Sequence, residues 1–227
     1  MKSLLFKVCL LSLIVISYSC KKSSDSSSNP APSFPAEWYS LKQNSNDTVL
    51  VQGGYLYLQT SYNAGNTSKT ATSATTYGQI SGDFEFTVNF SSFSPKGSKY
   101  ASDVFAFLLV PSGGGIPVIS GNLTDSMLYI MDNTLSSPTL KYTTNRQGTI
   151  YVKRIGANYT SWMCAGTDTV YLNKTNYSTA PLNLGFEIGS LDNTATHTSV
   201  HVQNFVIKGG GGVVVSDPFT KNTVTAL

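Results

Sequence analysis

The residues that could carry out acid–base chemistry are few, and their spacing matches no familiar catalytic pattern. The chain has three glutamates, Glu37, Glu85 and Glu187. The closest carboxylates two positions apart are Asp83 and Glu85, and residues at i and i+2 lie on one face of a strand. Glycoside hydrolysis uses two carboxyl groups about 5–10 Å apart across the scissile bond. This pair could meet that need, but an exposed polar strand face explains the same two residues more simply.

A serine or cysteine nucleophile would need a basic partner, and the sequence offers two histidines for that role. His197 and His201 are four residues apart, so they lie on the same side of one predicted strand. Cys164 could pair with either of them. A lone thiol beside Trp162 and Met163 is more typical of a packed cysteine. We therefore predict no catalytic residues, and a binding protein rather than an enzyme.

Metal ligands are equally sparse. The two histidines are too isolated to form a site by themselves. The pairs Asp132-Asn133 and Asp192-Asn193 carry the oxygen atoms that Ca²⁺ prefers, but Asp and Asn in loops also form Asx turns. We predict no cofactor and no metal ligand, with a structural calcium ion as the alternative.

Aromatic residues give the sequence its best candidates for a binding site. Sugar rings present apolar C–H faces that can stack on aromatic side chains, while amides, carboxylates and guanidinium groups can bind their hydroxyls. Trp162 follows a predicted hairpin turn, and we expect Tyr159 and Arg154 to lie near it across that hairpin. A core position for Trp162 is the alternative. The further candidates are Tyr151, Tyr57 and Tyr77.

Composition narrows the class of protein. The net charge is +3 and charged residues make up 12% of the chain. The sequence therefore lacks the basic patch that would indicate nucleic acid as a partner. The surface must instead be rich in uncharged hydrogen-bonding groups, as in many extracellular β-domains.

The N-terminus predicts export and lipid attachment. Lys2 and Lys7 flank the start of an apolar run that is too short to span a bilayer. The run ends at Ile16-Ser17-Tyr18-Ser19-Cys20, which resembles the lipobox of bacterial lipoproteins in the looser form found in Bacteroidetes. That resemblance implies a signal peptide over 1–19, lipid on Cys20 and an outer-membrane location, with the cell surface as one of its two sides. An ordinary secretory signal is the alternative.

The rest of the chain divides into a tether and one domain. Residues 20–35 are rich in Ser and Pro and contain almost nothing to bury, which predicts a flexible tether. Residues 36–227 are enough for one core. After the signal is removed, Cys20 and Cys164 are the remaining cysteines, so a lipidated Cys20 leaves no disulfide to stabilise this domain.

Apolar residues in this domain recur at a period of two, which predicts an all-β fold. A hairpin is expected around Gly156-Ala157-Asn158, where Gly and Asn tolerate positive φ. The run Val104–Val110 is continuously apolar, which indicates a strand covered on both faces. The remaining predicted strands are Tyr55–Thr60, Asp83–Phe90, Met127–Met131, Leu140–Thr143, Thr149–Ile155, Leu182–Ile188 and Ser199–Ile207.

Several of these segments resemble the concanavalin A-like lectin/glucanase superfamily in their order and spacing. Gly82–Val88 is similar to its Gly-Asp-Phe strand, and Val152–Gly156 to its Arg-x-Gly hairpin. Leu184–Gly189 and Val200–Ile207 look like its closing pair of strands. The resemblance covers about Trp38 to Lys208. It implies a jelly-roll sandwich of two antiparallel sheets whose concave face or rim loops take up carbohydrate.

The resemblance also bears on catalysis. Family 16 glucanases on this fold carry the strand motif Glu-x-Asp-x-x-Glu, which is absent here. We therefore expect a surface lipoprotein that binds a polysaccharide or glycan without cleaving it. Two alternatives stay open: a structural lipoprotein that binds a protein partner in the outer membrane, and a glycoside hydrolase with atypical catalytic residues.

Overall fold

The structure is a computed structural model of the 227-residue chain. It describes residues 38–42, 47–61, 71–95, 103–132, 138–177, 179–190, 197–209, 214–217, 219 and 224–226. The predicted signal peptide, Cys20 and the tether lie outside the described residues. The described part of the chain contains no helix with the length and apolarity needed to cross a membrane.

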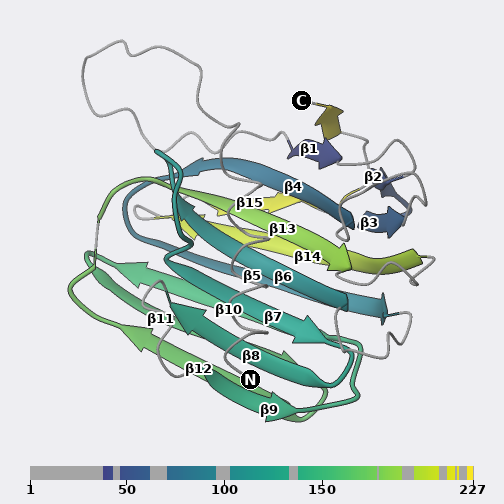
Figure 1. The fold of residues 1–227 in the computed structure, drawn as a ribbon. Helices are drawn as coiled ribbons and strands as arrows, with labels where there is room; N and C mark the ends of the chain where they lie inside the picture. Colours follow the sequence, from purple (N-terminus) through teal and green to yellow (C-terminus); the bar gives the residue numbers. More distant parts are fainter. Residues whose placement is uncertain are drawn as a thin grey trace.

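The described strands form two sheets stacked on one another (Figure 1). Sheet I has the order β16 (Val224–Ala226), β1 (Trp38–Lys42), β4 (Ala71–Ile80), β13 (Leu182–Ser190), β6 (Asp103–Pro111), β7 (Ile119–Thr124), β8 (Met127–Asp132) and β9 (Thr139–Tyr142). Sheet II has the order β12 (Asp168–Lys174), β11 (Asn158–Ala165), β10 (Gly148–Ile155), β5 (Phe84–Ser94), β14 (His197–Gly209), β3 (Tyr55–Ser61) and β2 (Thr48–Gln52), and β15 (Val214–Asp217) also pairs with β14. Neighbouring strands are antiparallel except for β1 and β16. The predicted all-β sandwich is confirmed.

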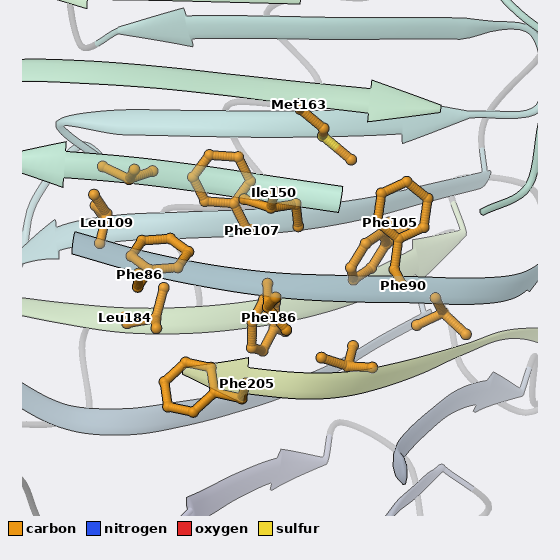
Figure 2. Close-up of a cluster of buried hydrophobic side chains, with 14 of the residues drawn as sticks. Phe86, Phe90, Phe105, Phe107, Leu109, Ile150, Met163, Leu184, Phe186 and Phe205 are labelled. Atoms are coloured by element: carbon orange, nitrogen blue, oxygen red, sulfur yellow. The ribbon is translucent and has the colours of Figure 1, made fainter. Parts of the chain in front are cut away.

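The core lies between the sheets and follows from the alternation in each strand. In β5, Phe84, Phe86, Val88 and Phe90 are buried, whereas the residues between them are partly exposed. Figure 2 shows aromatic and aliphatic side chains from both sheets meeting in this layer. The ring centroids of Phe86 and Phe107, which come from different sheets, are 6.1 Å apart.

Strand β6 is buried on both faces, as its continuous apolar run predicts. Phe105, Phe107 and Leu109 belong to the core between the sheets. The other face of β6 forms a second cluster on the outside of sheet I. Its members are Val104, Ala106, Leu108 and Val110.

The predicted hairpin is formed by β10 and β11. Ile155 pairs with Asn158, so Gly156 and Ala157 make a two-residue turn. Gly156 has a φ of 55°, which suits the first position of a type II′ turn and is accessible to glycine without strain.

The Gly-Asp-Phe and Arg-x-Gly segments contact each other at this turn. Arg154 Nε donates a hydrogen bond of 2.7 Å to the carbonyl of Gly82, and Nη2 of the same guanidinium also donates to it. The backbone N–H of Gly156 donates to Asp83 Oδ1 at 2.7 Å. The guanidinium carbon of Arg154 lies 4.8 Å from the centroid of the Phe84 ring. These two segments therefore hold the hairpin to the start of β5.

Candidate functional site

The outer face of sheet II carries three aromatic side chains in register on adjacent strands. Tyr151 of β10 pairs with Trp162 of β11, which pairs with Tyr171 of β12. Their strand neighbours Ile150, Met163 and Val170 are fully buried on the opposite face, so alternation directs the three rings away from the core. We call Tyr151, Trp162 and Tyr171 the aromatic row.

The aromatic row is partly open to solvent. The rings of Tyr151 and Trp162 are stacked, with centroids 5.4 Å apart and planes 12° apart, so each covers one face of the other. Tyr171 is 59% exposed. Trp162 is thus placed on a surface rather than in the core, and a ligand could reach the ends and edges of the stack.

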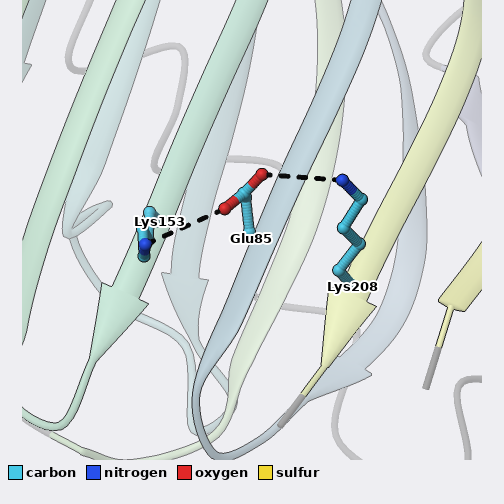
Figure 3. A network of polar contacts seen from close by, with 3 residues as sticks. All are labelled: Glu85, Lys153 and Lys208. Carbon is cyan, nitrogen blue, oxygen red and sulfur yellow. Dashed lines mark ion pairs between the residues drawn. The ribbon is translucent and has the colours of Figure 1, made fainter. Parts of the chain in front are cut away.

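Charged side chains lie along one side of the aromatic row. Glu85 of β5 sits between Lys153 and Lys208 (Figure 3), and each of its carboxylate oxygens is 4.0 Å from one lysine Nζ. These side chains are partly exposed, so the ion pairs add little stability. Partial burial raises the pKa of Tyr151, and the negative charge of Glu85 and the hydrogen bond that the tyrosine hydroxyl donates to this carboxylate raise it further. Tyr151 therefore offers a protonated hydroxyl at neutral pH.

Uncharged hydrogen-bonding groups lie along the other side. Thr149 of β10 pairs with Asn89 of β5, which pairs with Gln203 of β14. The Thr149 hydroxyl donates to Asn89 Oδ1 at 3.0 Å. The free thiol of Cys164 lies on the same face, paired with Thr149. The aromatic row is therefore bordered on both sides by side chains that can donate or accept hydrogen bonds and that remain partly exposed.

Arg154 and Tyr159 do not reach this face. Both are 1% exposed and point into the core, where Arg154 Nη1 donates to the carbonyl of Ala180 at 2.8 Å. The reason is spacing: Arg154 is three residues from Tyr151, and Tyr159 is three residues from Trp162. Side chains an odd number of positions apart in a strand point to opposite faces. The two residues pair with each other across the hairpin, but they lie on the face of sheet II opposite to Trp162 and do not adjoin a ligand on the aromatic row.

The other predicted residues lie elsewhere. Tyr57 is on the outer face of sheet II but in β3, where its ring contacts His201. Tyr77 is in sheet I, with its backbone paired to Trp38 and Leu184, and its side chain lies outside the described part. Tyr171 was not among the predicted residues because β12 was not predicted as a strand. The alternation of Val170 and Leu172 around it is the signal that could have identified it.

The outer face of sheet I contains a buried carboxyl group. Glu187 is 2% exposed, and its Oε2 has no hydrogen-bond partner. Burial raises the pKa of Glu187 to about 7. It pairs in register with Ala106 of β6 and Ala74 of β4 and lies between Gly185 and Gly189 of its own strand, so no second carboxylate occupies these nearest positions among the described residues.

The other groups with catalytic potential are held in structural contacts or lie apart. Asp83 caps the hairpin turn. Cys164 and His201 are on one face of sheet II but separated by β10 and β5 and by two residues along the strands, which puts them roughly 16 Å apart at the usual strand spacings. The side chain of His197 is outside the described part.

The loop pairs predicted as possible calcium ligands are only partly described. Asp132 lies 2.8 Å from Lys174 Nζ, whereas Asn133, Asp192 and Asn193 are outside the described residues. Within the described ranges, no group of three or more His, Cys, Asp or Glu side chains is placed to hold a metal ion.

No protein-family model and no curated protein sequence matches the chain. Solved structures do match. A sialidase is similar at 10% identity and a TM-score of 0.54, over 77% of this chain and 17% of that one. A legume lectin-like domain from Entamoeba histolytica is similar at 12% identity and a TM-score of 0.51, over 77% of this chain and 91% of that one. An alginate lyase from Polysaccharide Lyase family 7 is similar at 12% identity and a TM-score of 0.52, over 74% of this chain and 84% of that one.

The chain thus spans less than a fifth of the sialidase, 17% of its length, and most of the other two domains. Likeness at these identities concerns the fold, because one fold supports many functions. The described chain has the concanavalin A-like jelly-roll fold, a sandwich of two antiparallel sheets.

Proposed function

We propose that this domain binds carbohydrate without cleaving it, through the aromatic row on the outer face of sheet II. The observation that carries the proposal is the register of Tyr151, Trp162 and Tyr171 on three adjacent strands. Aromatic rings stack on the apolar faces of sugars, and nearby amides, hydroxyls and charged groups can bind sugar hydroxyls. Glu85, Lys153 and the Thr149–Asn89 pair supply such groups.

The comparisons support this proposal at the level of fold. The matched structures include a lectin-like domain and an alginate lyase, and both names refer to carbohydrate ligands or substrates. Asp83, the carboxylate two positions from Glu85, accepts a hydrogen bond from the Gly156 N–H, and Glu85 lies between two lysines. Hydrolysis uses a pair of carboxyl groups that act on the scissile bond, so these structural contacts support binding over hydrolysis.

Affinity electrophoresis through gels containing single polysaccharides tests the proposal. The purified protein should be retarded by at least one polysaccharide, and Trp162→Ala should weaken that retention roughly tenfold, as loss of one stacked ring predicts. Tyr142→Ala is the matched control because Tyr142 is 74% exposed but lies on sheet I. Retention by no polysaccharide, or equal retention of the Trp162 and Tyr142 variants, would contradict the proposed site.

We also propose that the protein is an outer-membrane lipoprotein with lipid on Cys20. The support is the sequence pattern alone: a basic start, a short apolar run, a small residue before Cys20 and a Ser/Pro tether. Cells grown with a palmitate analogue should label the protein, and Cys20→Ala should abolish the label while Cys164→Ala keeps it. Persistent labelling of the Cys20 variant would refute the assignment.

A protein partner is the second candidate ligand. Ile155 is 55% exposed and Tyr171 is 59% exposed, and both lie on the outer face of sheet II. Exposed apolar groups of this kind also occur in protein interfaces. Ile155→Ser separates the two candidates, because it should leave polysaccharide retention unchanged and should weaken binding to an outer-membrane protein that contacts this face.

A further inference from the structure

A second group of rings lies on the outer face of sheet II, away from the aromatic row. His201 of β14 stacks on Tyr55 of β3, with centroids 4.7 Å apart and planes 25° apart. Tyr57 contacts His201 edge-on at 5.3 Å, and its hydroxyl donates to Gln59 Oε1 at 2.5 Å. Tyr55 is 37% exposed. We call Tyr55, Tyr57 and His201 the histidine cluster.

The register of the strands fixes the distance between the two groups. Tyr151 pairs with Thr87, and His201 pairs with Ser91 four residues further along β5. Two strand spacings across the sheet and four residues along it give a separation of roughly 16 Å between Tyr151 and His201. This separation exceeds the length of a disaccharide.

Polar side chains occupy the surface between the two groups. Thr149, Asn89 and Gln203 are paired across β10, β5 and β14, and all three are partly exposed. They carry hydroxyl and amide groups and no charge. A chain of sugars that crossed this surface would therefore meet rings at both ends and hydrogen-bonding groups in the middle.

We propose that the histidine cluster is a second subsite for the same ligand, and that sheet II binds an internal stretch of a neutral polysaccharide rather than a chain end or a small sugar. The inference rests on the proposed carbohydrate-binding function. The ligand runs diagonally from Tyr171 to Tyr55, stacking on the rings at each end. Partial burial lowers the pKa of His201, which keeps its ring uncharged at neutral pH and suits a neutral sugar.

Chain-length dependence tests the second subsite. Dissociation constants of the full-length protein are measured by calorimetry for cellulose, laminarin and alginate oligosaccharides, from disaccharide to hexasaccharide. For at least one neutral series, the hexasaccharide should bind at least tenfold more tightly than the disaccharide. Replacing Tyr55 and Tyr57 together by Ala should remove that gain and leave disaccharide affinity unchanged, whereas Trp162→Ala should weaken binding at every length.

The outcomes separate the inference from the function on which it rests. Equal affinity for all lengths, or an unchanged gain in the double variant, would overturn the second subsite while leaving the aromatic row intact. Binding of alginate oligosaccharides alone would overturn the neutral class. Failure of the unmodified protein to bind any oligosaccharide or polysaccharide would remove the proposed function itself. Thermal unfolding of the double variant, with a midpoint close to that of the unmodified protein, excludes misfolding as the cause.

Discussion

Arg154 joins three separate segments of the chain from within the core. Its guanidinium donates to the carbonyls of Gly82 and Ala180 while its backbone belongs to β10. A planar guanidinium can serve several acceptors in different directions, which an ammonium group cannot do in the same way. The residue that resembles part of a family motif is therefore held in structural contacts within the core, and the binding site that we propose lies on the opposite face of β10.

Glu187 makes stability depend on pH. Its pKa is raised from 4.5 to about 7 by burial, so the folded protein keeps this proton up to about pH 7 while the unfolded chain releases it near pH 4.5. The folded state binds more protons in this window, and the contribution of Glu187 to stability therefore falls as pH rises from about 4.5 to about 7. This contribution to the free energy of unfolding falls by on the order of 3 kcal/mol.

Glu187→Gln should remove this fall while keeping the shape of the side chain. Urea unfolding followed at pH 5 and pH 7 measures the free energy of unfolding of both proteins. We expect the difference between the two pH values to shrink in the variant by about the amount assigned to Glu187. A difference that stays the same would show that this carboxyl group titrates normally.

At the scale of elements, the strands with long apolar patterns were predicted, whereas strands with a short alternation, such as β12, and strands rich in small or polar residues, such as β7, were not. Strand β5 alternates without interruption, and β6 is a continuous apolar run. Strand β7 has the sequence Ile-Ser-Gly-Asn-Leu-Thr, in which Gly and Asn oppose strand structure by propensity. It forms because β6 and β8 pair with it on both sides, which no local pattern reveals. The seven strands not predicted are β1, β2, β4, β7, β12, β15 and β16.

Gly121 shows why β7 carries a glycine. An added Cβ would lie 2.0 Å from Phe107 Cε1 and 3.1 Å from the sulfur of Met163. Gly121→Ala should therefore destabilise the fold by about 1–3 kcal/mol, as overpacking does. Gly113→Ala is the control because a Cβ there meets nothing within 4 Å. Thermal and urea unfolding compare the two variants, and equal stabilities would contradict the packing described for this strand.

At the scale of the whole molecule, the sandwich brings together residues that are far apart in the sequence. The resemblance of short motifs predicted the fold correctly, because the motifs occur along the chain in the same order and at similar spacing as the corresponding strands of that superfamily. The candidate site was predicted in part: Trp162 and Tyr151 lie together, whereas Tyr171 needed the pairing of β11 with β12. Of the histidine cluster, Tyr57 was among the candidates predicted from sequence, whereas its contact with His201 and the neighbouring Tyr55 depends on the pairing of β14 with β3.

The emission of Trp162 tests the central claim most directly. The chain has two tryptophans, so a Trp38→Phe background leaves Trp162 as the one reporter. Titration with a polysaccharide that retards the protein should change its fluorescence to saturation, over the same concentrations as retardation, because a sugar on the aromatic row displaces water from the indole. Retardation without any change in this fluorescence would place the glycan elsewhere and contradict the account.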